Sequence, residues 1–146
     1  MAKHLTHLEV LALPLHEQAL VTEKRRNSAR LREIKQMAAS LALLEPLQEQ
    51  IKAAGHTLYA DSISPALGKR QTLRILTHFM SAEVSLAKAL LTVGFAIVER
   101  DKGALRTVLF KKGRLTIQVF MSEEHLARAE EAFAAASAPA AAGAPA

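Results

Sequence analysis

Residues Gln71–Ser122, QTLRILTHFMSAEVSLAKALLTVGFAIVERDKGALRTVLFKKGRLTIQVFMS, carry the strongest secondary-structure patterns in this chain. Residues 73–80 alternate between two sets of side chains, which is the period of a strand. Ser81 then stands where an N-cap is expected, and Gly94 suits the left-handed residue that closes a helix. We therefore predict a strand over residues 73–80, followed by a helix over residues 82–93.

Three further strands are predicted after this helix. They span residues 95–100, 105–111 and 115–121, and the last of them alternates strictly. Lys112 and Gly113 fit the tight turn of a hairpin, because glycine tolerates the positive φ that such turns require. The predicted fold class is α+β, with a four- to five-stranded, mostly antiparallel sheet.

An N-terminal helical hairpin or bent rod is predicted before this block. Pro14 suits the first turn of a helix running from residue 15 to residue 54, and Pro46 predicts a break near Glu45 because proline has no amide hydrogen for the helical ladder. Apolar side chains recur through the second half of this region at a heptad-like spacing. This apolar stripe consists of Ile34, Met37, Leu41, Leu44 and Ile51.

The helix predicted over 82–93 is apolar on almost every side, and such a helix must be covered on two sides. The sheet would supply one cover. The apolar stripe is the best candidate for the other, provided either by the same chain or by a second copy. The sequence leaves both arrangements open.

The predicted organisation has four parts. An N-terminal arm (1–14) precedes the helical hairpin or bent helix (15–55). The α+β domain (56–136) ends in a helix that begins after Ser122, with Glu123 and Glu124 in its first turn. The last part, 137–146, is rich in Ala and Pro and is expected to be disordered, because it cannot bury enough apolar surface to offset the entropy lost on ordering.

Composition excludes several kinds of chemistry. The 146 residues include no cysteine, so disulfides, thiolate metal sites and cysteine nucleophiles are ruled out. His4, His7 and His16 do not fall at a recognised metal-ligand spacing. We also find no paired carboxylates and no Ser, His and Asp arrangement at a recognisable spacing. We therefore expect no enzyme, no cofactor, no metal and no small-molecule substrate.

No apolar run approaches the roughly 20 residues that a membrane span requires. The apolar stretch 8–15 is short and is interrupted by Glu9 and Pro14, so we do not expect a signal peptide. A cytoplasmic location with no membrane partner is the default expectation.

The net charge of +5 is unevenly distributed. Residues 22–35 carry +4 and residues 69–114 carry +7, so the remainder is acidic. Clustered positive charge favours an anionic partner, with nucleic acid first.

Cations alternate with aromatic residues on the predicted outward face of the sheet, where rings could stack on bases while cations meet phosphate. In the alternative, Phe110 and Phe120 belong to the core and the cations only keep the rim soluble. The candidate nucleic-acid residues are Arg25, Arg26, Arg30, Arg74, Arg106, Phe110, Lys111, Lys112, Arg114 and Phe120.

Two functional hypotheses follow from these patterns. The leading one is a non-catalytic binding or assembly protein that acts through the apolar stripe, either by self-association into a homo-oligomer or by docking on a protein partner. The alternative is a nucleic-acid-binding accessory protein that uses the basic helix and the basic and aromatic face of the sheet.

Overall fold

A computed structural model describes residues 4–66, 68–101 and 106–137. Its α+β fold confirms the predicted class. The chain divides into two compact units, Met1–Gln36 and Met37–Ala146, called unit 1 and unit 2 below. Residues 37–55, which we grouped with the N-terminal helix, thus belong to the unit that holds the sheet. The tail expected to be disordered lies outside the described residues except for Ser137, which ends the last helix.

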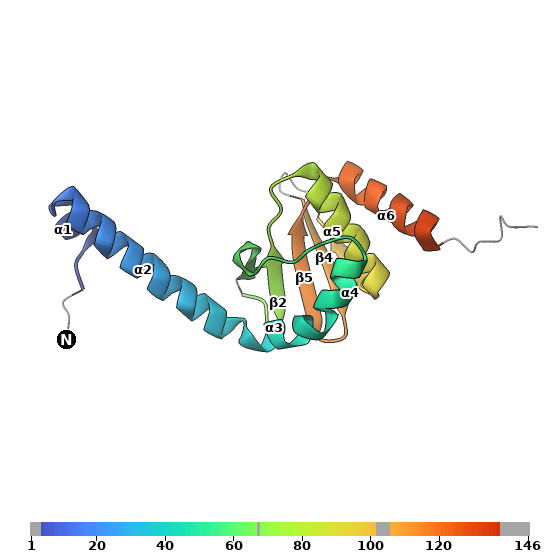
Figure 1. The fold of residues 1–146 in the computed structure, drawn as a ribbon, viewed down its shortest axis with the longest axis horizontal. Helices are drawn as coiled ribbons and strands as arrows, with labels where there is room; N and C mark the ends of the chain where they lie inside the picture. Colours follow the sequence, from blue (N-terminus) through green and yellow to red (C-terminus); the bar gives the residue numbers. More distant parts are fainter. Residues whose placement is uncertain (1–3, 67, 102–105, 138–146) are drawn as a thin grey trace, which may run out of the picture. The chain divides into compact units, whose positions relative to one another are not determined.

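Unit 1 consists of a short helix α1 (His7–Leu11) and a long helix α2 (Leu15–Gln36) (Figure 1). Thr6 caps α1 in a capping box, in which its hydroxyl accepts a hydrogen bond from the Glu9 amide at 3.2 Å. The amide side chain of Gln18 donates to the carbonyl oxygen of Leu13 at 2.7 Å and so fastens the link between the two helices to α2.

Unit 2 opens with a helical segment that is broken by Pro46, as predicted, and continues into the sheet. A second break, between α2 and the next helix, falls at Met37, whose backbone leaves helical geometry at ψ 7°. The elements are α3 (Ala38–Leu44), the 3-10 turn η1 (Glu45–Leu47), α4 (Gln48–Ala53), the 3-10 turn η2 (Ala60–Ser62), β1 (Ile63–Pro65), β2 (Thr72–Ile75), α5 (Met80–Val93), β3 (Ala96–Arg100), β4 (Thr107–Lys112), β5 (Leu115–Phe120) and α6 (Glu123–Ser137).

The five described strands form a mixed sheet in the order β1-β2-β5-β4-β3. β2 and β5 run parallel, and the other three neighbouring pairs run antiparallel. Thr72 is opposite Thr116 in the parallel pair. The turn between β1 and β2 therefore lies at the same end of the sheet as the hairpin turn between β4 and β5.

Two element boundaries differ from prediction around α5. β2 is shorter than expected because residues after Ile75 leave the sheet, so α5 begins at Met80 and not at Ala82. Its N-cap is Phe79, which makes no side-chain capping hydrogen bond, and not Ser81. Gly94 closes the helix in the left-handed region at φ 110°, as predicted.

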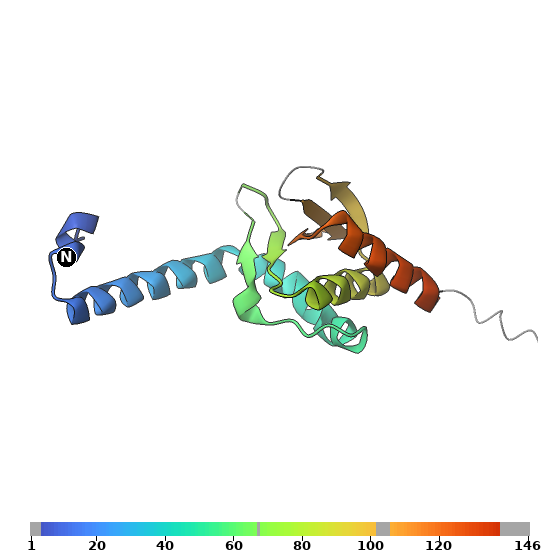
Figure 2. The same ribbon diagram turned by 90° about the horizontal axis from the view of Figure 1, so that it is seen from above.

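The core lies between one face of the sheet and helices α3–α6, which occupy the same side of it (Figures 1 and 2). Leu86 and Leu90 of α5 are fully buried. α5 contacts α4 and α6 as well as the core face of the sheet. The second cover that the apolar helix requires therefore comes from the same chain.

Candidate functional site

The structure places most of the apolar stripe in the core of unit 2. Met37 and Leu44 are each 3% exposed, Ile51 is 0% exposed, and Leu41 is partly buried against the same cluster. Only Ile34, on α2 of unit 1, is exposed. These buried side chains cover their own sheet and are not accessible to a partner, which corrects the expectation that the whole stripe forms a docking surface.

α2 is the helix in the described part of the chain that carries apolar side chains without burying any residue. Leu20 is 59% exposed, Leu31 52% and Ile34 40%. Their separations of eleven and three residues place all three within roughly 60° of arc on one side of a 3.6-residue helix. We call these three residues the α2 seam. Sequence reasoning assigned Ile34 to the downstream stripe and missed Leu20 and Leu31, although their spacing was readable.

The three arginines of α2 that we named as nucleic-acid candidates are engaged within unit 1. Arg26 pairs with Glu23 at 3.0 Å, and Arg30 pairs with Glu33 at 3.1 Å. The Arg25 guanidinium donates to the carbonyl oxygen of Leu5. Arg25 therefore links α2 to the N-terminal arm, whereas the pairs of Arg26 and Arg30 lie within α2.

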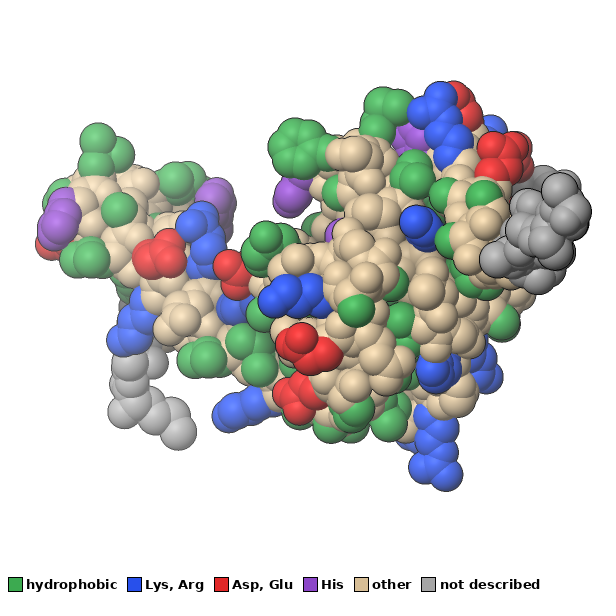
Figure 3. Space-filling model, turned by 45° about the vertical axis from the view of Figure 1, so that its right-hand side comes forward, with side chains coloured by type: hydrophobic (Ala, Val, Ile, Leu, Met, Phe, Trp, Pro, Cys, Tyr) green, Lys and Arg blue, Asp and Glu red, His purple; other side chains and the backbone are tan. Residues whose placement is uncertain are grey.

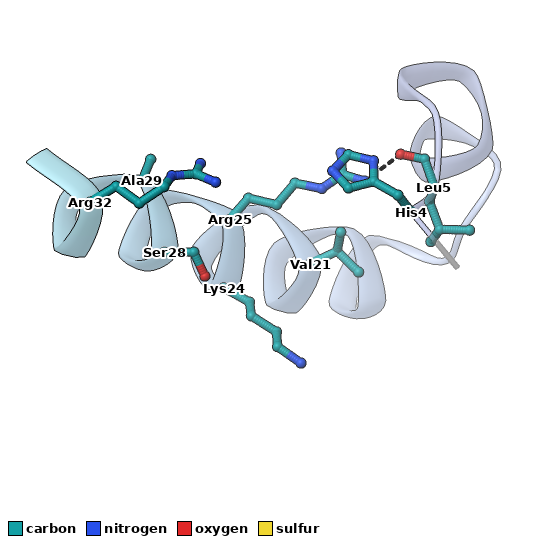
Figure 4. Close-up of a pocket in the computed structure, with 8 residues that line it drawn as sticks. All are labelled: His4, Leu5, Val21, Lys24, Arg25, Ser28, Ala29 and Arg32. Carbon is teal, nitrogen blue, oxygen red and sulfur yellow. Dashed lines mark hydrogen bonds between the residues drawn. The ribbon is translucent and has the colours of Figure 1, made fainter. Parts of the chain in front are cut away.

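A groove of about 580 Å³ runs between the start of the described chain and α2 (Figure 4). Arg25 and Arg32 extend along the same side of the helix, whereas Lys24 points away from them (Figure 4). The groove has a mainly apolar floor and a basic rim, and no carboxylate lines it. Its lining residues are His4, Leu5, Val21, Lys24, Arg25, Ser28, Ala29 and Arg32.

The sheet face opposite the core, called the outer face below, carries Arg74, Gln118 and Phe120. Arg74 and Gln118 are opposite each other in β2 and β5, and the Arg74 Nε donates to Gln118 Oε1 at 3.4 Å. The guanidinium carbon of Arg74 lies 5.1 Å from the centroid of the Phe120 ring, which is a cation–π contact. The side chains of Arg74 and Phe120 are half-buried. Leu109 also belongs to this face and is buried beside Gln118.

Three of the predicted nucleic-acid residues are committed elsewhere. Phe110 is opposite Ile117 on the core face and is fully buried, so the alternative that it belongs to the core holds. Lys112 donates from Nζ to the carbonyl oxygen of Val93 at the end of α5. Arg106 pairs with Glu123 of α6 at 3.4 Å. None of these three is offered to a ligand on the outer face.

Four cations gather at the end of the sheet where β2 and β5 begin. Lys69 and Arg70 lie in the turn before β2, whereas Lys111 is opposite Thr116 and Arg114 occupies the β4–β5 turn. All four are exposed, and none lies within ion-pair distance of a carboxylate in residues 4–66, 68–101 or 106–137. The end of the sheet where β2 and β5 begin faces downward in Figure 3, and Lys and Arg side chains project from the lower edge of unit 2 in that view. We call these four residues the basic end.

Acidic side chains concentrate at the opposite end of the sheet, where β3 and β5 finish. Arg100 there pairs with Glu130 at 2.9 Å, and Arg106 with Glu123. The cations at that end are therefore balanced, whereas those of the basic end are not. Lys69 and Arg70 were absent from the predicted set because only the parallel pairing of β2 with β5 brings them beside the hairpin.

A histidine–serine contact lies beside the start of α5. His56 Nδ1 is 2.9 Å from Ser85 Oγ, and Ser85 donates its own hydrogen to the carbonyl oxygen of Ala82. The serine oxygen is thus left to accept from His56 Nδ1–H. Burial lowers the pKa of His56, because desolvation disfavours the charged imidazolium. No described carboxylate hydrogen-bonds to His56, so the pair lacks the third group of a catalytic triad.

His56 also lines a small pocket of about 180 Å³. Two aromatic residues at its rim, Tyr59 and Phe79, are 68% and 74% exposed. The pocket is apolar in character, and the residues that line it include no Asp, Glu, Lys or Arg.

Within the described residues, no group of three or more His, Asp or Glu side chains could hold a metal ion. No helix in that same part of the chain is both long and apolar enough to cross a membrane. No protein-family model, curated protein or solved structure matches the chain. The candidate surfaces of the described residues are the α2 seam, the groove along α2, the pocket at His56, and the basic end with its adjoining outer face.

Proposed function

We propose that this is a non-catalytic assembly protein that self-associates through the α2 seam. The observation that carries the proposal is that α2 spans 22 residues and buries none of them, while Leu20, Leu31 and Ile34 stand exposed along one side. Helices in proteins owe most of their stability to packing of an apolar face. A second copy of the same helix supplies such packing for α2.

The charge distribution along α2 favours an antiparallel pair. Residues 15–23 contain Glu17 and Glu23 and no lysine or arginine, whereas residues 24–36 contain six basic residues and only Glu33 as an acid. An antiparallel arrangement sets the acidic part of each helix against the basic part of its partner. A parallel arrangement would place the two basic parts side by side, where like charges repel.

The free energy gained by burying the seam is of the same size as the cost of bringing two chains together. Fully burying one leucine or isoleucine side chain contributes about 1.5–3 kcal/mol. The three seam side chains are 40–59% exposed, so each can contribute roughly half of that figure. Two copies then gain roughly 5–9 kcal/mol, which is comparable with the association cost of about 4–15 kcal/mol. Because the balance is close, we expect a reversible assembly whose extent depends on protein concentration.

Sedimentation velocity of the full chain over a range of concentrations tests the proposal. The wild-type chain is expected to exceed its monomer mass of 15.8 kDa, and Leu20→Asp with Leu31→Asp should return it to that mass. The matched control is Thr22→Asp with Ala29→Asp, which adds the same charge to exposed positions on the opposite side of α2. The control should assemble like the wild type.

The proposal fails if the wild-type chain sediments as a monomer at every concentration up to the millimolar range. It also fails if both double variants weaken assembly equally, since that result would assign the effect to charge and not to the seam. Thermal unfolding of unit 2 provides a folding check, because neither pair of substitutions touches its core.

A further inference from the structure

We infer that the basic end and the adjoining outer face of the sheet form a binding site for single-stranded nucleic acid. The inference rests on unit 2 alone and is independent of the α2 seam. Its first support is the placement of Lys69, Arg70, Lys111 and Arg114, which the sheet register brings to one end. Unbalanced cations gathered at one end of a sheet form a surface complementary to a phosphate backbone.

The second support is the pair formed by Arg74 and Phe120. Beginning at the basic end, Thr116, Gln118 and Phe120 follow one another on the outer face of β5. Alternate residues of a strand are roughly 6.7 Å apart, so this row provides a hydroxyl, an amide and a ring in sequence from the cations. Arg74 is hydrogen-bonded to Gln118 and its guanidinium carbon lies over the Phe120 ring, so the ring and the guanidinium stand together where a base can stack against them.

This combination favours a single strand over a duplex. In a duplex the bases are stacked on each other, so a protein reaches only phosphates and groove edges. In a single strand each base can stack on an aromatic or guanidinium plane while the cations track the backbone. Cations alone would bind any polyanion. The side chains of Gln118 and Phe120 beside them would favour a polyanion that carries bases.

Fluorescence anisotropy of the full chain with a labelled 20-nucleotide oligothymidine is the test. We expect binding that weakens by at least about tenfold between 50 and 200 mM salt. Lys111→Glu with Arg114→Glu should weaken binding by about tenfold or more at low salt. The matched control, Lys52→Glu with Arg128→Glu, reverses the same amount of charge on exposed helix positions outside the basic end and should retain most of the binding.

Phe120 separates base stacking from simple charge attraction. Phe120→Leu keeps an apolar side chain on the half-buried site but removes the ring, and binding should fall by roughly 5- to 100-fold. Urea unfolding of each variant checks that unit 2 remains folded.

Three results would overturn the inference. The first is no change in anisotropy at 50 mM salt. The second is equal loss of binding in the control and the basic-end variants. The third is binding that is unchanged by Phe120→Leu and is displaced equally well by inorganic polyphosphate, by a duplex of the same length or by an acidic polypeptide, because such a site recognises negative charge alone.

Discussion

Lys112 of β4 donates a hydrogen bond from Nζ to the carbonyl oxygen of Val93 at 2.5 Å, across the gap between the hairpin and the end of α5. Val93 is the last residue of α5, where the unpaired carbonyl groups form the negative end of the helix dipole. The same ammonium group would lie 3.3 Å from a Cβ added at Gly94. Lys112 therefore fastens the β4–β5 hairpin to the helix, and its neighbour Lys111 is left to solvent.

Lys112→Met is expected to lower the free energy of unfolding by about 1 kcal/mol, the size of a cation's interaction with a helix C-terminus. Lys111→Met is the control and should change it by less than about 0.5 kcal/mol, as exposed surface substitutions do. Urea unfolding followed by circular dichroism measures both. Equal effects of the two substitutions would contradict the assigned role of Lys112.

Ile51→Ala should destabilise unit 2 strongly, because Ile51 is fully buried on α4. Loss of a buried isoleucine costs about 2–5 kcal/mol, from lost transfer free energy and from the cavity left behind. Leu43→Ala, at a position 38% exposed on α3, is the comparison and should cost clearly less. If Ile51→Ala instead abolished self-association at unchanged stability, the stripe would have to face a partner after all.

Glu83 and His125 join α5 to α6 through a short contact in which both side chains are largely buried, 20% and 12% exposed. Removing the Glu83 side chain leaves the His125 ring without its hydrogen bond, so Glu83→Ala should cost about 1–3 kcal/mol. Glu124→Ala breaks the exposed pair with Arg128 within α6 and should cost no more than about 0.5 kcal/mol. Hydrogen exchange of α6 amides should quicken in the first variant and stay unchanged in the second.

The stability of unit 2 should depend on pH through His56. Its pKa is lowered in the folded chain, so between that value and the ordinary value of 6.5 the unfolded chain binds more protons. The free energy of unfolding therefore rises as pH rises across this window. As pH falls through the window, the contribution of neutral His56 to that free energy is lost. His56→Asn should flatten that part of the profile in urea titrations at several pH values. An unchanged slope in the variant would assign the dependence to another group.

The local elements of unit 2 could be predicted because their signals are local. The Gly94 terminus, the hairpin at Gly113 and the strict alternation of β5 all depend on neighbours in sequence. The run Val108–Phe110 was different, because three consecutive apolar residues fit either face of a strand. All three are buried. The hairpin register pairs Lys112 with Leu115 and so sets Phe110 opposite Ile117 on the core face, and this register cannot be told from the run itself.

The candidate surfaces depended on contacts between distant residues and were predicted only in part. Lys69 and Arg70 join Lys111 and Arg114 through a parallel pairing of β2 with β5, which nothing in either strand specifies. The break at Met37 has no proline or glycine to mark it, so the apolar stripe read as continuous from Ile34 to Ile51. Its members downstream of the break pack into unit 2, and Ile34 stays on α2 with Leu20 and Leu31.

The most direct test of the central claim is amide hydrogen exchange of α2 in the full chain, measured over a hundredfold range of protein concentration. Self-association through the seam predicts that protection of residues 20–34 rises with concentration, while amides of β5 in the core of unit 2 keep constant rates. Protection of α2 that does not change with concentration would contradict the claim, whether the helix exchanged rapidly throughout or was equally protected at the lowest concentration.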